Sequence, residues 1–478
     1  MKKSFGILVL ASSSLAVAGF QTAPSSSASV LSTKRSSLSQ LQAVSIPEAP
    51  MVQQEKEENP FQIDMAGVKF SGMNGKALKW KDEDFPSASD LRAVIPKDCF
   101  VPDTLTSLKY LSVSLVGTAL CTAFGFNVLL PLLNPSEMFS NPLLALFGTT
   151  VWSAYALVTG TVAMGLWVLA HECGHGAFSK NNDLQDGIGY ILHSFFLVPY
   201  FSWQRSHAVH HKFTNHMDLG ETHVPEPSDG SKEDGSLGQR KVFQSVLGEK
   251  KGLQAFGGFQ MFLHLILGWP AYLWIGATGG PDRGMTNHYW PNPLTDPKDQ
   301  KDELFPNKWK EKVWQSDIGV AVMGTAVLAF AAFQGIPTMM ALYGLPLIVV
   351  NSWLVVYTWL QHTDVDVPHF SKDEHSFVKG ALHTIDRPYN KMDPWGAIDF
   401  LHHQIGTTHV AHHFASNIPH YKAQTATDAI MDSYPDMYLY DPTPIPEALW
   451  RVCKGCTAVE KRGDRWVWQN EDIPKQLL

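Results

Sequence analysis

Clusters of histidine at short, repeated spacings are the residues of this chain best suited to chemistry. The eight side chains belong to two HxxHH patterns and one HxxxH pattern: His207, His210, His211, His409, His412, His413, His171 and His175. On a helix, residues three and four apart share one face, so the imidazoles of each cluster project together. The repetition predicts that the eight histidines form one multinuclear metal site.

The first cluster also matches HExxH, the arrangement of two zinc ligands and a base found in metalloproteases, with Glu172 as the base. A membrane zinc protease is therefore an alternative. That site uses one zinc ion and about three protein ligands, which leaves both HxxHH clusters without a role. Imidazole also suits iron and copper, and a larger histidine set can hold two ions. Two iron ions can reduce O2 and attack an unactivated C–H bond, which acid–base side chains cannot do.

Long apolar runs without charged residues adjoin the clusters and predict membrane spans, since a spanning helix needs about 20 mostly apolar residues. We assign four spans, to Leu111–Leu133, Leu143–Ala170, Ile318–Phe333 and Met339–Leu360. The fold expected is an all-α integral membrane protein of two transmembrane helical hairpins, with a His-rich di-iron cap on one side of the membrane. A His-rich metal transporter is a further alternative, but it would carry histidines and carboxylates at bilayer depth, where these spans have none.

Two other apolar runs are expected to stay on one side of the membrane. The HxxxH cluster ends the second span and the last HxxHH follows the fourth, so a shared metal site requires an even number of crossings between them. Ala255–Gly279, which contains Gln260, His264 and Pro270, should therefore lie in the interface or re-enter without crossing. Gly187–Phe201 is too short to cross and should form a half-buried helix beneath the cap.

The N-terminal residues read as a targeting leader. A basic start and an apolar run end at Ala16-Val17-Ala18, and a Ser- and Ala-rich segment follows Phe20. This order resembles the two-part plastid leader of algae with secondary plastids, and it predicts a plastid membrane, with the endoplasmic reticulum as the alternative. The expected organisation is a leader (1–45), a soluble lead-in (46–108), a membrane domain (109–440) and a C-terminal tail (441–478).

Composition excludes two classes of protein. The net charge is −8 and no basic block resembles a nucleic-acid footprint. Five cysteines, an odd number without paired spacings, give no disulfide framework.

The three clusters lie in segments that resemble the histidine boxes of membrane-bound fatty acid desaturases: HECGHGAFS (171–179), VPYFSWQRSHAVHHKFTNH (198–216) and THVAHHFASNIPHYKA (408–423). The resemblance covers nearly the whole chain after about residue 90. LQHT (360–363), DRPY (386–389) and PHY (419–421) further resemble the methyl-end group of that family. This group acts on C18 acyl chains at the Δ12 (ω-6) or Δ15 (ω-3) position.

The resemblance implies two iron ions, O2 as co-substrate, and electrons from ferredoxin or cytochrome b5. It also implies one ligand beyond the boxes, near the last span, for which His362 is the candidate. Carried over to this chain, the ligands are His171, His175, His207, His210, His211, His362, His409, His412 and His413. His402 and His403 are expected to orient ligands, and Glu172 to support them rather than act as a base. His193, His216, His223 and His420 are expected to be structural or on the surface.

The resemblance also indicates the reaction. The first box reads HECGH, which resembles Δ12 enzymes more than the HDCGH of ω-3 enzymes. Conversion of oleoyl to linoleoyl chains in a membrane acyl lipid is therefore the expected activity, and ω-3 (Δ15) desaturation of linoleoyl chains the alternative. A front-end desaturase is disfavoured, because position 409 is His and no HPGG motif of a fused cytochrome b5 domain is present.

Overall fold

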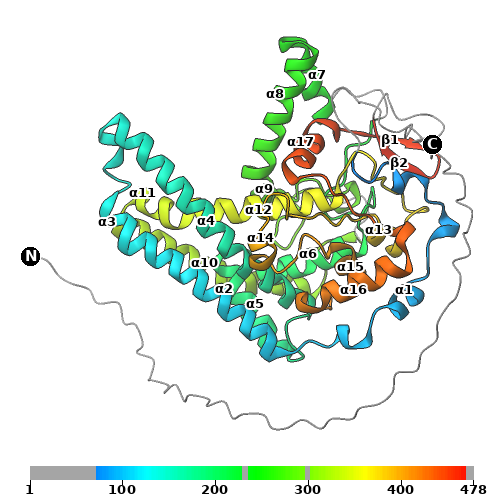
Figure 1. Ribbon diagram of the computed structural model, residues 1–478, viewed down its shortest axis with the longest axis horizontal. Coiled ribbons are helices and arrows are strands. Elements are labelled where there is room, and N and C mark those ends of the chain that lie inside the picture. Colours follow the sequence, from blue (N-terminus) through cyan, green and yellow to red (C-terminus); the bar gives the residue numbers. More distant parts are fainter. Residues whose placement is uncertain (1–70, 229–234, 297–301, 470–478) are drawn as a thin grey trace, which may run out of the picture. The chain divides into compact units, whose positions relative to one another are not determined.

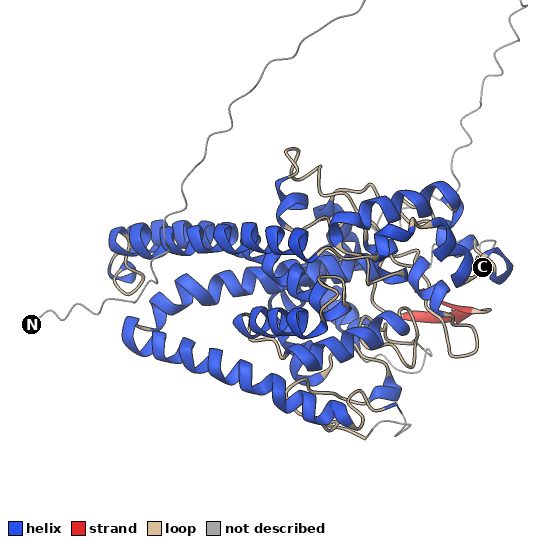
Figure 2. Ribbon diagram, turned by 90° about the horizontal axis from the view of Figure 1, so that it is seen from below, coloured by secondary structure: helices blue, strands red, loops and turns tan. Residues whose placement is uncertain are grey.

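The structure, a computed structural model, describes residues 71–228, 235–296 and 302–469. All of them belong to one compact unit, Glu58–Leu478. The predicted leader and the first part of the lead-in lie outside the described residues. Within them the regular secondary structure is helical, apart from one antiparallel hairpin of β1 (Val459–Arg462) and β2 (Arg465–Trp468) (Figure 2).

Four of the described helices are long and apolar enough to cross a membrane: Thr104–Leu132, Pro142–His175, Lys308–Gln334 and Ile336–His362. They contain α2 (Thr104–Phe124) with α3 (Leu130–Leu132), α4 (Pro142–His175), α10 (Lys308–Gln334), and α11 (Ile336–Met339) with α12 (Leu345–His362). Figure 1 shows them extending in one direction from the cap, with α3 and α11 near their far ends. The predicted all-α membrane fold of two hairpins is confirmed.

Three apolar helices contain a short π-helical segment, and each segment is followed at its second residue by a proline. Proline lacks the backbone N–H and its ring clashes with the carbonyl one turn back. A widened turn accommodates this ring within an otherwise continuous helix. The segments and prolines are η4 (Gly125–Leu129) with Pro131, η6 (Leu263–Gly268) with Pro270, and η9 (Met340–Gly344) with Pro346.

Ala255–Gly279, the longer of the two apolar runs that were expected not to cross, lies in a helical segment that is not among the four spans. It comprises α8 (Glu249–Phe262), η6 and α9 (Trp269–Ile275), and α7 (Gly235–Leu247) packs against α8. Figure 1 shows α8 running across the direction of the spans. The requirement for an even number of crossings between the histidine clusters is therefore met.

Gly187–Phe201 does not form the single helix that the sequence predicted. α5 (Asn182–Phe195) ends before Leu197, whose φ of 58° lies in the left-handed region. Pro199 then forms the N-cap of α6 (Tyr200–Lys212). The prediction was wrong because the left-handed residue and the proline together break the helix.

The cap has its own apolar core, to which the N-terminal part of the described chain contributes. Trp80 and Leu91, from the predicted lead-in, pack in one cluster with Val410, Ile430 and Leu439. α17 (Ile445–Gly455), in the predicted tail, packs in the core that contains the span residues. The boundaries at 108 and 440 stay predictions, and no separate core marks either one.

The remaining elements are short and lie mostly in the cap. The α-helices are α1 (Ala88–Val94), α13 (Phe377–Leu382), α14 (Ala397–Leu401), α15 (His409–Phe414) and α16 (His420–Ser433). The 3₁₀ turns are η1 (Lys76–Lys79), η2 (Asp82–Asp84), η3 (Lys97–Phe100), η5 (Met138–Ser140), η7 (Pro281–Arg283) and η10 (Pro435–Met437).

Candidate metal centre

The ends of two spans and two cap helices bring all nine predicted ligands together. α4 ends with the HxxxH cluster, α12 ends at His362, and α6 and α15 carry the two HxxHH clusters. Helical spacing alone places the histidines of each cluster on one face. Packing of the four helices then makes these faces meet.

The first group comprises five histidines whose candidate ligand atoms lie within 4.8 Å of one another: His171, His175, His207, His211 and His412. The His171 Nε2 atom is 2.9 Å from that of His207 and 3.3 Å from that of His175. The Nε2 atoms of His207 and His211 are 3.2 Å apart. The five imidazoles therefore direct nitrogen atoms toward a common volume.

The second group comprises His210, His362 and His413, with the same 4.8 Å limit. His362 Nε2 lies 3.1 Å from His210 Nε2 and 3.0 Å from His409 Nε2, so His409 adjoins this group. His362 thus lies among the box histidines, as the resemblance implied. Its role as a ligand, like that of the other eight, remains a prediction.

The electrostatics of both groups favour neutral imidazoles, the form that can bind a metal ion. Burial lowers the pKa of His210 to about 4 and, together with the nearby His210, that of His412 to about 3. The Nε2 atoms of His412 and His413 are buried and have no hydrogen-bond partner within the described ranges. Two clusters of neutral nitrogen donors, each buried or partly buried, fit two transition-metal ions better than one catalytic zinc.

The contacts of Glu172 differ from those expected of a hydrolytic base. Its Oε1 accepts a hydrogen bond from the backbone N–H of His420, and its Oε2 lies 2.7 Å from His420 Nδ1. Both residues are buried. This contact ties the end of α4 to the start of α16, and it does not fit the HExxH protease alternative.

The other histidines lie outside the two groups. His402 contacts Tyr357 Oη and the Thr161 carbonyl, each at 2.8 Å, and His403 Nε2 is 3.2 Å from Ser114 Oγ. These bonds connect the cap to the spans, so the expectation that the pair orients ligands is not met.

Four histidines were expected to be structural or on the surface. His193 and His216 are buried, and His420 binds Glu172. His223 comes nearest to the groups, because its ring stacks on that of His362 with a centroid distance of 5.4 Å.

Asp386, the first residue of the DRPY motif, fastens the helix that carries the last box. Its Oδ1 accepts hydrogen bonds from the backbone N–H groups of His409 at 2.5 Å and Val410 at 3.1 Å, and Tyr438 donates to its Oδ2 at 2.5 Å. These bonds satisfy N–H groups that the first turn of α15 leaves unpaired. The sequence resemblance drew attention to DRPY but gave this aspartate no role.

Replacing Asp386 with alanine is expected to destabilise the protein and reduce its metal content. Loss of a helix cap costs about 0.5–2 kcal/mol, and buried N–H groups left unpaired add to this. Asp386→Asn keeps a side-chain oxygen and should lose less. Thermal unfolding in detergent and metal analysis would measure both effects. An alanine variant as stable and metal-rich as the unmodified protein would contradict this role.

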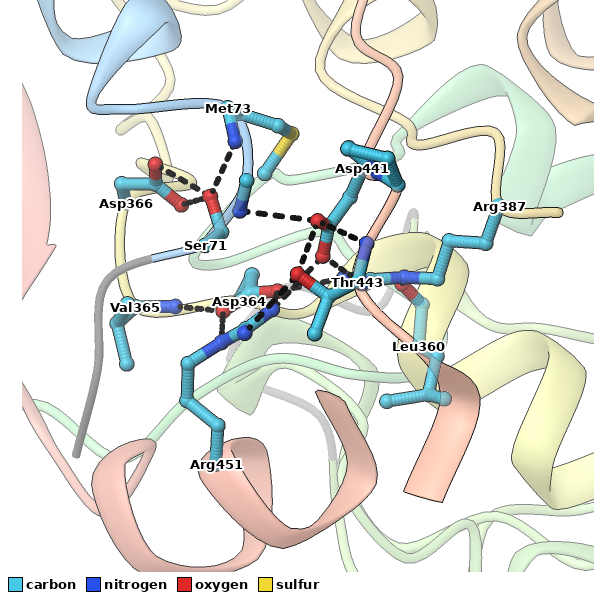
Figure 3. Close-up of polar contacts among 12 residues, drawn as sticks. Ser71, Met73, Leu360, Asp364, Val365, Asp366, Arg387, Asp441, Thr443 and Arg451 are labelled. Carbon is cyan, nitrogen blue, oxygen red and sulfur yellow. Dashed lines mark hydrogen bonds and ion pairs between the residues drawn. The ribbon is translucent and has the colours of Figure 1, made fainter. Parts of the chain in front are cut away.

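A buried ion network, here called the network behind His362, begins two residues after that histidine, at Asp364 (Figure 3). Arg387 donates through Nε to the Leu360 carbonyl at 2.8 Å and pairs with Asp364 at 2.6 Å and with Asp441. Arg451 pairs with the same two aspartates, each at 2.7 Å. The network joins the end of α12 to DRPY and to α17, and so fixes the backbone that leads from His362.

The charge of this network depends on pH in a defined direction. Burial opposes ionisation of Asp441, but Arg387 and Arg451 lower its pKa from 3.8 to about 2. Because the pKa of Asp441 is lower in the folded protein than its ordinary 3.8, its ion pairs with Arg387 and Arg451 contribute stability above pH 3.8, and this stability is lost as the pH falls toward 2.

A third aspartate, Asp366, lies beside the network and accepts hydrogen bonds from the Ser71 hydroxyl at 2.7 and 2.8 Å (Figure 3).

A cavity of about 440 Å³ borders the histidine groups. His207 and His210 form part of its wall, together with Trp203, Trp269 and Trp359. The rest of the wall is mostly apolar and comes from the 221–226 loop, the α8–α9 segment with the loop after it, α12, and the end of α17. This is the form of a site for a long apolar ligand, placed beside residues that could hold metal ions.

Comparison with known proteins agrees with this geometry. The family model for fatty acid desaturases matches residues 150–443. A Delta(12)-fatty-acid desaturase of Arabidopsis thaliana is 36% identical over 391 residues, which cover 81% of this chain and 92% of that protein. An omega-6 fatty acid desaturase, endoplasmic reticulum, of Brassica juncea is 34% identical, covering 80% of this chain and 91% of that protein.

A third relative carries a different product geometry in its name. An acyl-lipid (9+3)-(E)-desaturase of Dimorphotheca sinuata is 34% identical and covers 78% of this chain and 88% of that protein. The match of the family model spans more than half of the chain, and these relatives are matched over most of their length. The four spans, the histidine groups and these similarities together show that the chain belongs to the fatty acid desaturase family, as a membrane-bound enzyme of its methyl-end group.

Proposed function

We propose that the protein is an O2-dependent Δ12 desaturase, which converts oleoyl to linoleoyl chains in membrane acyl lipids. The observation that carries the proposal is the apolar cavity whose wall includes His207 and His210. The names of the Arabidopsis and Brassica relatives support the Δ12 position. An ω-3 enzyme, which would act on linoleoyl chains nearer the methyl end, stays the alternative.

The proposed cofactor is a pair of iron ions, held by the nine histidines in their two groups. When bound, the pair supplies the oxidation of adjacent CH2 groups with O2. The protein provides neutral imidazoles, fixes their directions through Asp386 and the network behind His362, and holds the acyl chain in a wall of tryptophans.

The proposed location is a plastid membrane, with ferredoxin as electron donor, on the strength of the two-part leader at 1–45. The Brassica relative, whose name includes the endoplasmic reticulum, supports the alternative, with cytochrome b5 as donor. Fusion of residues 1–45 to a fluorescent protein in an alga with secondary plastids separates the two. Plastid fluorescence supports the proposal, and a reticular pattern replaces it with the alternative.

Expression of residues 46–478 in yeast, which supplies oleate and cytochrome b5, tests the reaction directly. Fatty acids are analysed by gas chromatography with and without added linoleate. New linoleate is the expected result. α-Linolenate formed only on feeding would make the enzyme ω-3. Because the proposed donor is ferredoxin, the expression is repeated with a ferredoxin and its reductase, and no new fatty acid with either donor from a folded, metal-loaded protein would overturn the proposal.

Filling the cavity should block the reaction without disturbing the metal ions. Gly268 lines the cavity, and a Cβ atom there would make only ordinary contacts, with Val355 at 3.5 Å and with the His264 Cβ atom at 4.0 Å. The Gly268→Met side chain should therefore enter the acyl site and reduce linoleate formation about tenfold or more, the effect expected of a misplaced substrate. Gly258→Met is the matched control, because a Cβ at Gly258 on exposed α8 meets nothing within 4 Å. Equal product from both variants would show that the chain binds elsewhere.

A further inference from the structure

Two carboxyl side chains line the acyl cavity among the described residues, and they differ in burial. Glu226 is exposed, whereas Glu221 is 3% exposed. The Oε1 atom of Glu221 is buried and has no hydrogen-bond partner within the described part of the chain. Burying a carboxyl group with one oxygen left without a hydrogen bond costs free energy of folding. The position of Glu221 on the same wall as His207 and His210 therefore suggests a function.

Glu221 is at one end of a buried series of hydrogen-bonded polar side chains. Tyr272 donates to Glu221 Oε2 at 3.2 Å, and the hydroxyls of Tyr272 and Ser206 are 2.9 Å apart. Ser206 Oγ lies 2.9 Å from His288 Nε2, which is also 3.8 Å from Glu221 Oε1. Ser206 immediately precedes His207, so this series of side chains extends to the backbone of the first histidine group.

The surroundings of Glu221 favour its protonated form. Burial raises its pKa to about 8, against smaller opposing effects of the Tyr272 hydrogen bond and of Arg283. Burial also lowers the pKa of His288 to about 4. At neutral pH the pair is therefore a carboxylic acid beside a neutral imidazole. Such an acid can give up a proton in an otherwise apolar cavity.

We propose that Glu221 is the proton donor for the oxygen that the reaction reduces to water. The inference rests on the proposed function. Formation of the double bond removes two hydrogen atoms from adjacent CH2 groups, and the electron donor adds two electrons. O2 becomes two water molecules, which need two further protons. Glu221 supplies these protons one at a time and is reprotonated from the solvent between the two transfers, while Tyr272, Ser206 and His288 orient its carboxyl group.

Glu221→Gln tests the proposal, because glutamine keeps the shape and the acceptor oxygen but has no transferable proton. Desaturation by the metal-loaded variant should fall by on the order of a hundredfold, the usual effect of losing a general acid. Metal content and thermal stability should match those of the unmodified protein. More O2 should be consumed per double bond formed. The matched control is Glu447→Gln, which is exposed in the first turn of α17 and outside the cavity wall, and which should change none of these quantities.

Infrared spectroscopy of the metal-free protein at pH 7 gives a readout independent of activity. The difference spectrum between the unmodified protein and Glu221→Gln should contain the C=O band of a protonated carboxyl. Tyr272→Phe should shift that band, since it removes the hydrogen bond to Oε2.

Three outcomes would overturn the proposal: a carboxylate band only, a Glu221→Gln variant as active as the unmodified protein, or a variant that loses metal. The last would make Glu221 a ligand. An unmodified protein without any desaturation product would instead overturn the proposed function, so the two failures are distinguishable.

Discussion

Replacing His210 with alanine is expected to reduce desaturation below detection and to lower the metal content of the purified protein. His210 lies 3.1 Å from His362 Nε2, and its ring centroid is 5.0 Å from that of His413, so the variant removes one of the three histidines of the second group. Mutation of residues that merely support a ligand typically costs 10–100-fold in metal affinity or activity. Loss of a ligand should exceed that, so a decrease of at least about a hundredfold is expected.

The control for this variant is another histidine outside both groups. His375 Nε2 contacts the Thr214 carbonyl at 2.9 Å, and His375→Ala removes one hydrogen bond worth about 1 kcal/mol. Fatty acid analysis and metal content are measured for both variants in the same cells. If His210→Ala kept its metal and its product, the second histidine group would not be a metal site.

Replacing Arg387 with alanine should give the largest loss of stability. Arg387 is fully buried and pairs with Asp364 and Asp441, which are also buried. Breaking a buried pair by removing one partner costs about 3–5 kcal/mol, since it leaves charge without compensation. The expected result is a markedly lower unfolding temperature in detergent and little folded protein in the membrane.

Arg462→Ala is the matched control for this variant. Arg462 pairs with Glu460 on the hairpin, where both side chains are partly exposed. Partly exposed pairs contribute little, typically below about 1 kcal/mol, so the unfolding temperature should hardly change. Equal losses in the two variants would mean that the network behind His362 does not support the fold.

The spans and the meeting of the histidine clusters could be predicted from the sequence, because each depends on a local pattern. Charge-free runs of about 20 residues mark the spans, and spacings of three and four place the histidines of a cluster on one helix face. The crossing rule then excluded Ala255–Gly279 as a span without any knowledge of the packing. His362 could be proposed only through the family resemblance.

The supporting residues could not be predicted, since their roles arise from contacts between distant segments. Asp386 meets the start of α15, and Arg387 meets Asp441, 54 positions away. Nothing in the neighbouring sequence of Glu221 indicates that it is buried beside a chain of hydroxyls. The break between α5 and α6 was missed because apolar character continues through Leu197 and Pro199, although the helix does not.

The length of α4 carries its histidines well beyond the lipid-facing part of the helix. The helix has 34 residues and is about 51 Å long, whereas the hydrocarbon layer is about 30 Å thick. Its exposed apolar residues extend only to Val158, and every residue from Ala163 to Cys173 is buried in protein.

The reacting carbons of a lipid would therefore have to leave the lipid phase and enter the protein to reach the histidines. Each CH2 group exposed to water on the way would cost about 0.8 kcal/mol. The cavity lined by tryptophans avoids that cost, because the acyl chain passes from the apolar lipid phase into apolar surroundings in the protein. Under the proposed function, the enzyme therefore withdraws an acyl chain from the lipid phase before it oxidises that chain.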